Sequence, residues 1–136
     1  ILISCIFYFY TSIVYGAPFL SKINETLHFS ALLTTTTVIP LCLNLGPDIN
    51  IWIKSLHLHS TDESSCLNVV YSITCMSSLF GAWLGAFPIP LDWDRPWQIW
   101  PISCVIGNIL GYITGAFLSS IYILFKYRQL NKLKLT

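Results

Sequence analysis

Four long stretches without a single charged residue restrict the fold of this chain more than any other feature. They cover residues 1–21, 26–47, 64–91 and 96–125. A helix needs about 20 residues, at about 1.5 Å each, to cross the roughly 30 Å hydrocarbon core of a bilayer. All four stretches reach that length. They are also continuous, whereas the strands of a membrane barrel alternate apolar and polar residues, so they indicate helices.

The composition points to the same solvent. Of the 136 residues, 10% are charged and 54% are hydrophobic, whereas a soluble domain is about 25% charged. Too few charged side chains are present to form a polar shell around an apolar core. In lipid the backbone must satisfy its own hydrogen bonds, as a helix does. We therefore predict an all-α, polytopic helical membrane protein that forms a single membrane domain over residues 1–136.

Prolines and polar turns set the expected limits of about four transmembrane helices. Pro88 and Pro90 end the third span, because proline cannot continue the helical hydrogen-bond ladder. Pro101 fits the first turn of the fourth span, where a missing N–H is tolerated, and Pro40 is expected to kink the second. The predicted spans are residues 1–20, 26–45, 66–87 and 99–125.

Basic residues at the end of the chain set the predicted orientation. Basic side chains just beyond a span favour the cytoplasmic side, so the tail over residues 126–136 is predicted to be cytosolic. By alternation, residues 22–25 and 92–98 face the lumen and residues 46–65 face the cytosol. The basic residues of the tail are Lys126, Arg128, Lys132 and Lys134.

Two of these lysines have a second interpretation. Lys132 and Lys134 stand five and three residues from the end of the sequence. This spacing resembles the dilysine retrieval signal on the cytosolic tails of endoplasmic reticulum membrane proteins. Such a signal is an address and does not anchor the protein. The alternative is that both lysines are an ordinary basic flank of the last span.

Glycines recur every four residues in the third and fourth spans. Gly81 and Gly85 form one pair, and Gly107, Gly111 and Gly115 continue the spacing over three turns. Glycines four apart leave a groove on one helix face, so that another helix can pack closely against it. That helix belongs either to this chain or to a second subunit, and the sequence leaves both alternatives open.

The turn between the third and fourth spans combines charged residues with tryptophan. Either an aspartate–arginine ion pair ties the hairpin together, or the turn contacts a partner protein or a phospholipid head group. Paired carboxylates can also hold a divalent ion, but no nucleophile and no ligand set accompanies them, so no catalytic residue and no metal site is predicted here. The residues assigned to a partner or head-group contact are Asp92, Trp93, Asp94, Arg95, Pro96 and Trp97.

The remaining ionisable residues give no sign of a catalytic, metal or cofactor site. His57 and His59 would share a face only on a strand, and no further His or Cys completes a ligand set, so we expect solvated loop residues. The cysteines lack CxxC spacing and are interpreted as small apolar packing residues. No charged residue lies deep inside a span, which disfavours a proton-coupled transporter.

The turn and its flanking spans resemble a known family. The stretch over residues 81–104, GAWLGAFPIPLDWDRPWQIWPISC, closely resembles the PIG-F family, and the similarity continues into Gly107 and residues 111–112. The first 65 residues resemble that family only in being apolar spans. The residues that fit the family pattern are Gly81, Trp83, Gly85, Phe87, Pro88, Pro90, Asp92, Trp93, Asp94, Arg95, Pro96, Trp97, Trp100 and Pro101.

The resemblance implies a non-catalytic subunit of the endoplasmic reticulum membrane that needs no cofactor. Family members have about six spans, so we expect about two more before Ile1, which is not a Met. The resemblance also implies larger catalytic partners, of the PIG-O and PIG-G type, which transfer ethanolamine phosphate from phosphatidylethanolamine to GPI mannoses in the lumen. This chain would stabilise them. The alternative function is to bind or present a phosphatidylethanolamine head group through residues 92–95.

Overall fold

Helices form all the regular structure of the described residues. A computed structural model of the chain describes residues 1–18, 21–46, 64–91 and 95–134. Within these ranges no strand occurs, so the predicted all-α fold is confirmed. The elements in chain order are α1 (Leu2–Val14), α2 (Ile23–Leu45), α4 (Ser64–Ala86), the short 3-10 helix η1 (Pro96–Gln98) and α5 (Ile102–Lys134).

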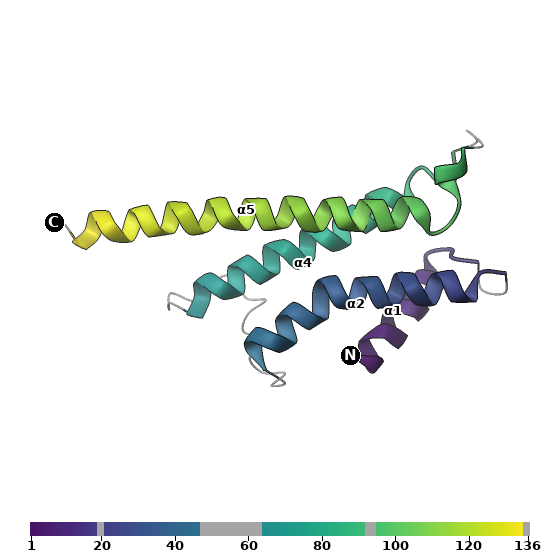
Figure 1. Ribbon diagram of the computed structural model, residues 1–136, viewed down its shortest axis with the longest axis horizontal. Coiled ribbons are helices and arrows are strands. Elements are labelled where there is room, and N and C mark those ends of the chain that lie inside the picture. The colour runs from purple at the N-terminus through teal and green to yellow at the C-terminus, as the bar shows by residue number, and fades with distance from the viewer. Residues whose placement is uncertain (19–20, 47–63, 92–94, 135–136) are drawn as a thin grey trace.

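The α4 and α5 helices form the most extensive helix contact of the described residues. They run antiparallel and are joined by the turn that contains η1 (Figure 1). The α2 helix packs most extensively on α1, and its contact with the α4–α5 pair is mainly with α4. The connections from α1 to α2 and from α4 to α5 therefore lie at the same end of the molecule, at the right in Figure 1.

Three of these helices are long and apolar enough to cross a membrane. Their spanning segments are Ile23–Leu43, Leu67–Ala86 and Ile102–Gln129. The α1 helix is shorter than the span predicted over residues 1–20, because it ends at Val14 after 13 residues. Gly16 follows with a φ of 100°, a left-handed conformation that glycine adopts without strain.

The other helices differ from the predicted spans at their ends. The α5 helix begins at Ile102 and not at residue 99, since Pro101 precedes it and accepts its first hydrogen bond, from the Val105 N–H at 2.9 Å. It continues to Lys134, so most of the predicted tail is helical; its Lys, Arg, Gln and Leu residues are good helix formers. Pro40 lies inside α2, and α2 bends in its second half (Figure 1).

Polar and small residues lie between the helices, whereas large apolar side chains lie outside. On α5 the buried positions recur every three or four residues, and most exposed positions carry apolar side chains. This is the reverse of a soluble fold and fits a lipid environment, where small and polar residues join helices. The buried residues of α5 include Cys104, Asn108, Gly111, Gly115 and Ser119, and the exposed ones include Ile106, Leu110, Ile113, Phe117 and Leu124.

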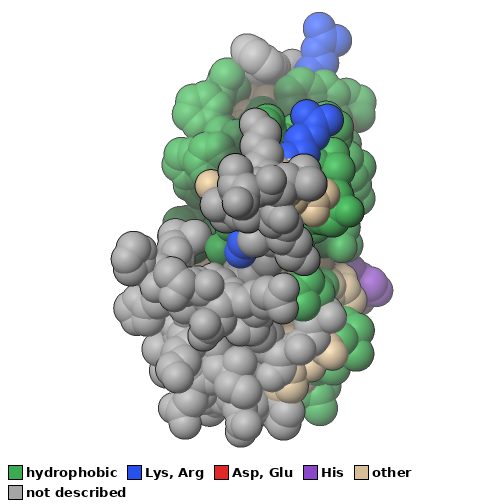
Figure 2. Space-filling model, turned by 90° about the vertical axis from the view of Figure 1, so that its left-hand side faces the viewer, with side chains coloured by type: hydrophobic (Ala, Val, Ile, Leu, Met, Phe, Trp, Pro, Cys, Tyr) green, Lys and Arg blue, Asp and Glu red, His purple; other side chains and the backbone are tan. Residues whose placement is uncertain are grey.

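The end of the molecule opposite the α4–α5 turn carries basic residues. Lys126 is half-buried and Arg128 is exposed in the last three turns of α5. Figure 2 looks at this end and shows Lys or Arg side chains among hydrophobic side chains in the upper part of the molecule. Charge thus gathers at one end of a long apolar helix, as it does beside a membrane surface.

Candidate functional site

The glycines of α4 and α5 bring the two helix backbones into direct contact. A Cβ atom at Gly81 would meet the Gly107 carbonyl oxygen and would lie 2.8 Å from the Gly111 Cα. A Cβ at Gly85 would meet the Ser103 carbonyl oxygen and would lie 2.9 Å from the Cys104 Cα. Any side chain at these positions would push the helices apart.

Gly115 extends the same contact toward the far end of α4. A Cβ there would lie 2.8 Å from the Ser77 Cβ and 2.9 Å from the Thr74 Cα. Of the two alternatives for the glycine faces, packing within this chain is therefore the arrangement in the structure. A helix of another subunit cannot occupy those same backbone surfaces while α4 and α5 remain paired.

A buried polar chain links three helices beside the glycine contact. The Asn108 amide of α5 donates to the Ser78 hydroxyl at 2.9 Å and more weakly to the Ser78 carbonyl at 3.4 Å. The Ser78 hydroxyl of α4 donates to the Thr36 hydroxyl of α2 at 3.2 Å. Asn108 and Ser78 are fully buried. The sequence analysis did not predict these hydrogen bonds, because a lone polar residue in an apolar run does not reveal which helix it faces.

Gln98 closes the turn between α4 and α5. Its amide nitrogen donates to the carbonyl oxygens of Pro88 at 2.8 Å and Leu91 at 2.7 Å. Its amide oxygen accepts from the Arg95 N–H at 2.8 Å. Three backbone groups of an irregular segment are thus satisfied by one side chain. The sequence analysis placed Gln98 only at the limit of the turn.

Trp100 joins this turn to the start of α2. Its ring packs edge-on against Phe29, with ring centres 5.5 Å apart. Its indole N–H donates to the Thr26 hydroxyl at 3.1 Å, and the Lys22 ammonium lies 3.5 Å from its carbonyl oxygen. The two connections predicted to face the lumen are therefore in contact with each other.

The predicted contact residues of the turn are placed in part. Arg95, Pro96 and Trp97 are exposed; Pro96 and Trp97 belong to η1, and Arg95 directly precedes it. Asp92, Trp93 and Asp94 lie outside the described residues, and so do His57 and His59. Lys132 and Lys134 fall in the last turn of α5. Over the described ranges, no group of three or more His, Cys, Asp or Glu side chains is placed to hold a metal ion.

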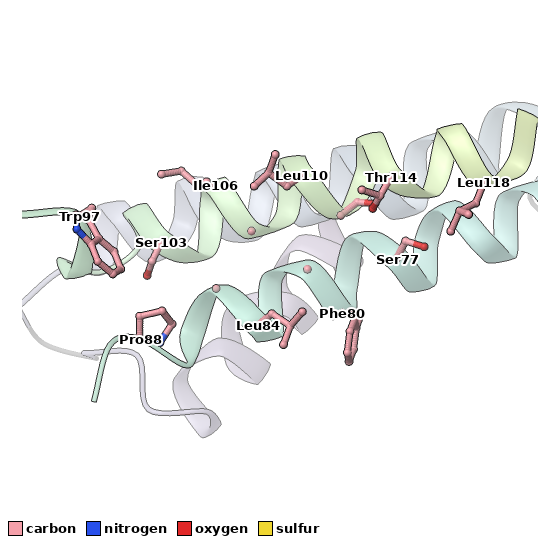
Figure 3. A pocket seen from close by; sticks show the side chains of 14 residues that line it. Ser77, Phe80, Leu84, Pro88, Trp97, Ser103, Ile106, Leu110, Thr114 and Leu118 are labelled. Carbon is pink, nitrogen blue, oxygen red and sulfur yellow. The ribbon is translucent and has the colours of Figure 1, made fainter. Parts of the chain in front are cut away.

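A long groove follows the outer side of the α4–α5 pair, away from α1 and α2 (Figure 3). Its volume is about 660 Å³. The glycine contact forms its floor, and apolar side chains form its walls. Trp97 and Pro88 stand at one end and Leu118 at the other (Figure 3). The wall residues are Phe80 and Leu84 from α4 and Ile106 and Leu110 from α5.

The family model of the GPI biosynthesis protein family Pig-F matches residues 1–120. The chain belongs to the PIG-F family. The match includes α1 and α2, so the similarity extends over the first 65 residues, for which the sequence analysis found only apolar spans. It also includes α4, η1 and most of α5, and thus every contact described above.

Individual PIG-F relatives agree with the family match. The GPI ethanolamine phosphate transferase stabilizing subunits of Mus musculus and Homo sapiens are 41% and 40% identical over 130 residues, or 96% of this chain. A PIGF/3-ketodihydrosphingosine reductase fusion protein of Schizosaccharomyces pombe is 42% identical over 111 residues, which are 80% of this chain and 21% of that protein. The chain spans 58% of the length of the mouse and human proteins. No solved structure matches it.

Proposed function

We propose that this chain belongs to a non-catalytic stabilising subunit of the ethanolamine phosphate transferase complexes of GPI-anchor biosynthesis. The observation that carries the proposal is its identity of 41% to the mouse stabilizing subunit over 96% of the chain. The partners are the larger catalytic subunits, of the PIG-O and PIG-G type. The described part of the chain fits an assembly role, because hydrogen bonds among Asn108, Ser78 and Thr36 join three of its helices.

The exposed turn around η1 is the surface that we assign to the catalytic partner. The glycine faces are occupied within the chain, so a partner must use side chains that remain outside. Arg95 and Trp97 are exposed at this end, and Arg and Trp are enriched among residues that dominate binding energy at interfaces. Gln98 bonds to the backbone of Pro88, Leu91 and Arg95 and so fixes these residues before binding, which lowers the entropic cost of association.

The proposed location is the endoplasmic reticulum membrane, with the C-terminal end of α5 in the cytosol. The basic residues of that end support this orientation. Lys132 and Lys134 would act there as a retrieval signal. Replacing both with Ala is expected to move the tagged protein out of the endoplasmic reticulum in fluorescence microscopy, whereas Lys126→Ala is expected to leave it in place.

Co-purification tests the stabilising role. The tagged full-length protein is isolated in mild detergent, and the catalytic subunits are quantified by mass spectrometry, together with their abundance in cells that lack the protein. We expect co-purification from wild type and a loss with Arg95→Ala. Arg128→Ala, an exposed arginine at the other end, is the matched control. Unchanged transferase abundance in cells that lack the protein, together with failed GPI modification, would contradict a stabilising role.

A further inference from the structure

The groove on the outer side of the α4–α5 pair has room for a hydrocarbon chain along its length but not for the full width of a helix. Ser103 and Leu118, which line its two ends, are 15 positions apart on α5, so the groove is about 22 Å long at about 1.5 Å per residue. A volume of about 660 Å³ then gives a mean cross-section of about 30 Å². A helix about 10 Å across has a cross-section of roughly 80 Å², so most of it would lie outside the groove. A hydrocarbon chain, with carbon contacts of about 4 Å, needs only roughly 20 Å².

One end of this groove contains a buried hydroxyl, that of Ser103, whose hydrogen bonds are not satisfied within the described part of the chain. The Ser103 side chain is buried, with 7% of its surface exposed, and its hydroxyl has no hydrogen-bond partner among the described residues. Figure 3 shows it pointing from α5 toward Pro88 at the end of α4. The Thr114 hydroxyl, near the other end, already donates to the Gly111 carbonyl at 2.9 Å. A ligand would therefore place its polar part at Ser103.

The charge around the groove gives the same polarity. Trp97 lines the end where Ser103 lies, and Arg95 is exposed two residues before it. Tryptophan is enriched at the interface between head groups and hydrocarbon, and the planar guanidinium of arginine binds phosphate oxygens in pairs. From this end to Leu118 the groove walls are apolar except for Ser77 and Thr114. Its lining thus runs from Trp97 and the Ser103 hydroxyl to a hydrocarbon surface, and Arg95 precedes Trp97 by two residues in the sequence.

We propose that this groove binds one acyl chain of a membrane glycerophospholipid. The chain lies on the glycine floor between α4 and α5, an ester oxygen accepts a hydrogen bond from the Ser103 hydroxyl, and the phosphate lies beside Arg95. The lipid fills the space that the paired glycines leave outside the helix contact. The head-group end of this site shares Arg95 and Trp97 with the surface proposed for the catalytic partner, but the acyl groove along α4 and α5 does not. Loss of acyl-chain labelling and loss of the partner are therefore separate outcomes.

Photo-crosslinking in membranes tests the site. The probe is a phosphatidylethanolamine with a diazirine near the methyl end of one acyl chain, added to membranes that hold the full-length protein and its partners. We expect crosslinks at the far end of the groove, at Ser77, Thr114 and Leu118. Ile106→Trp fills the groove and is expected to lower crosslinking about tenfold, the lower limit for a ligand misfit in an apolar pocket.

Matched controls separate specific binding from contact with bulk lipid. Ile113 is 56% exposed and Ile106 is 49% exposed, but Ile113 does not line the groove, so Ile113→Trp should leave crosslinking unchanged. Ser103→Ala should lower it about fivefold through loss of one hydrogen bond. Unlabelled phosphatidylethanolamine should compete with the probe, whereas a diacylglycerol, which lacks the phosphate, should compete poorly.

Three results would overturn the site. The first is equal labelling of all exposed α5 positions in the wild-type protein. The second is equal competition by the two unlabelled lipids. The third is crosslinking of a partner helix along the groove in place of lipid. Co-purification of the catalytic subunits is measured on the same membranes, so a failure of lipid binding with retained partners would refute this inference alone.

Discussion

Asn108 connects α5 to α4, and through Ser78 the connection reaches α2. In lipid, apolar side chains give no preference for another helix over the acyl chains, so hydrogen bonds between helices and close packing select the arrangement. Asn108 also keeps one acceptor unused, since its amide oxygen has no partner within the described part of the chain. The residue therefore fixes the position of α2 along the α4–α5 pair at some energetic cost.

Replacing Asn108 should weaken the helix assembly. Asn108→Ala removes both donors to Ser78 and leaves a cavity, so we expect a loss of roughly 1–3 kcal/mol in the free energy of unfolding. The measurement is unfolding by SDS from detergent micelles. Asn131→Ala, at an exposed position of the same helix, should change little. Equal stabilities of the two variants would show that the buried amide contributes nothing to packing.

The turn should depend on the donors of Gln98. In Gln98→Glu the carboxylate still accepts from the Arg95 N–H but has no N–H for Pro88 and Leu91. We expect the free energy of local opening over residues 88–98 to fall by roughly 1–3 kcal/mol. Hydrogen-exchange mass spectrometry should then show faster amide exchange in this segment. Gln129→Glu, exposed near the other end of α5, supplies the control. An unchanged exchange rate in the turn would rule out this role of Gln98.

For single residues, the sequence predicted the helix-packing glycines but not the hydrogen-bond partners of the polar side chains. The four-residue spacing of Gly107 and Gly111 was enough to predict a helix-packing face, because it follows from helix geometry alone. The bonds of Asn108 and Gln98 depend on which helix and which loop carbonyls come close. No local pattern contains that information, so these contacts were found only in the structure.

Among the elements, the α4–α5 pair has the closest contact, because its helices meet through glycine backbones. Glycine lowers helix stability by about 1 kcal/mol relative to alanine in a helix interior. Five such residues in two helices need a compensating gain, and close backbone approach provides it through dispersion and weak Cα–H contacts to carbonyl oxygens. The two helices are thereby joined with little participation of large side chains.

A single added methyl group tests this contact. Gly111→Ala should raise helix propensity, yet its Cβ would meet the Ser77 carbonyl and lie 3.0 Å from the Gly81 Cα. Backbone atoms cannot move aside, so overpacking should prevail and lower the unfolding free energy by roughly 1–3 kcal/mol. SDS unfolding is again the measurement. Ala116→Val, at an exposed α5 position, should stay near wild type, and a stabilised Gly111→Ala protein would contradict the glycine contact.

The element limits were predictable where proline marks them and not elsewhere. The α4 helix ends at Ala86, two residues before Pro88, as expected for a residue that cannot extend the ladder. The ends of α1 and α5 carry no such signal. The predicted first span extended to residue 20 only because these residues are uncharged. The predicted fourth span ended before Lys126, the first charged residue, although a charged residue does not end a helix in water.

In the whole molecule, the two ends differ in chemistry. One end holds the α4–α5 turn, with Trp100 against the start of α2, and the other holds the basic end of α5. With 33 residues, α5 is about 50 Å long, which exceeds the roughly 30 Å hydrocarbon core by about 20 Å. The sequence analysis predicted that the two turns lie on the same side of the membrane. It did not predict their contact, because Phe29 and Trp100 are far apart in the sequence and no local pattern pairs them.

Chemical labelling of single cysteines tests the orientation. Glu25 and Arg95 are exposed at the end with the turns, and Gln129 is exposed near the basic end of α5. In sealed endoplasmic reticulum vesicles with the cytosolic face outward, a membrane-impermeant maleimide should label Gln129→Cys at once. Glu25→Cys and Arg95→Cys should react only after detergent opens the vesicles. The five native cysteines are replaced by Ala in each variant to remove background.

The contact between the two turns links the outcomes at Glu25 and Arg95. Because the Lys22 ammonium lies 3.5 Å from the Trp100 carbonyl oxygen, these two positions must share a compartment. Labelling of one without the other would refute the packing of α2 against the turn, whereas early labelling of both would reverse the orientation and leave the fold intact.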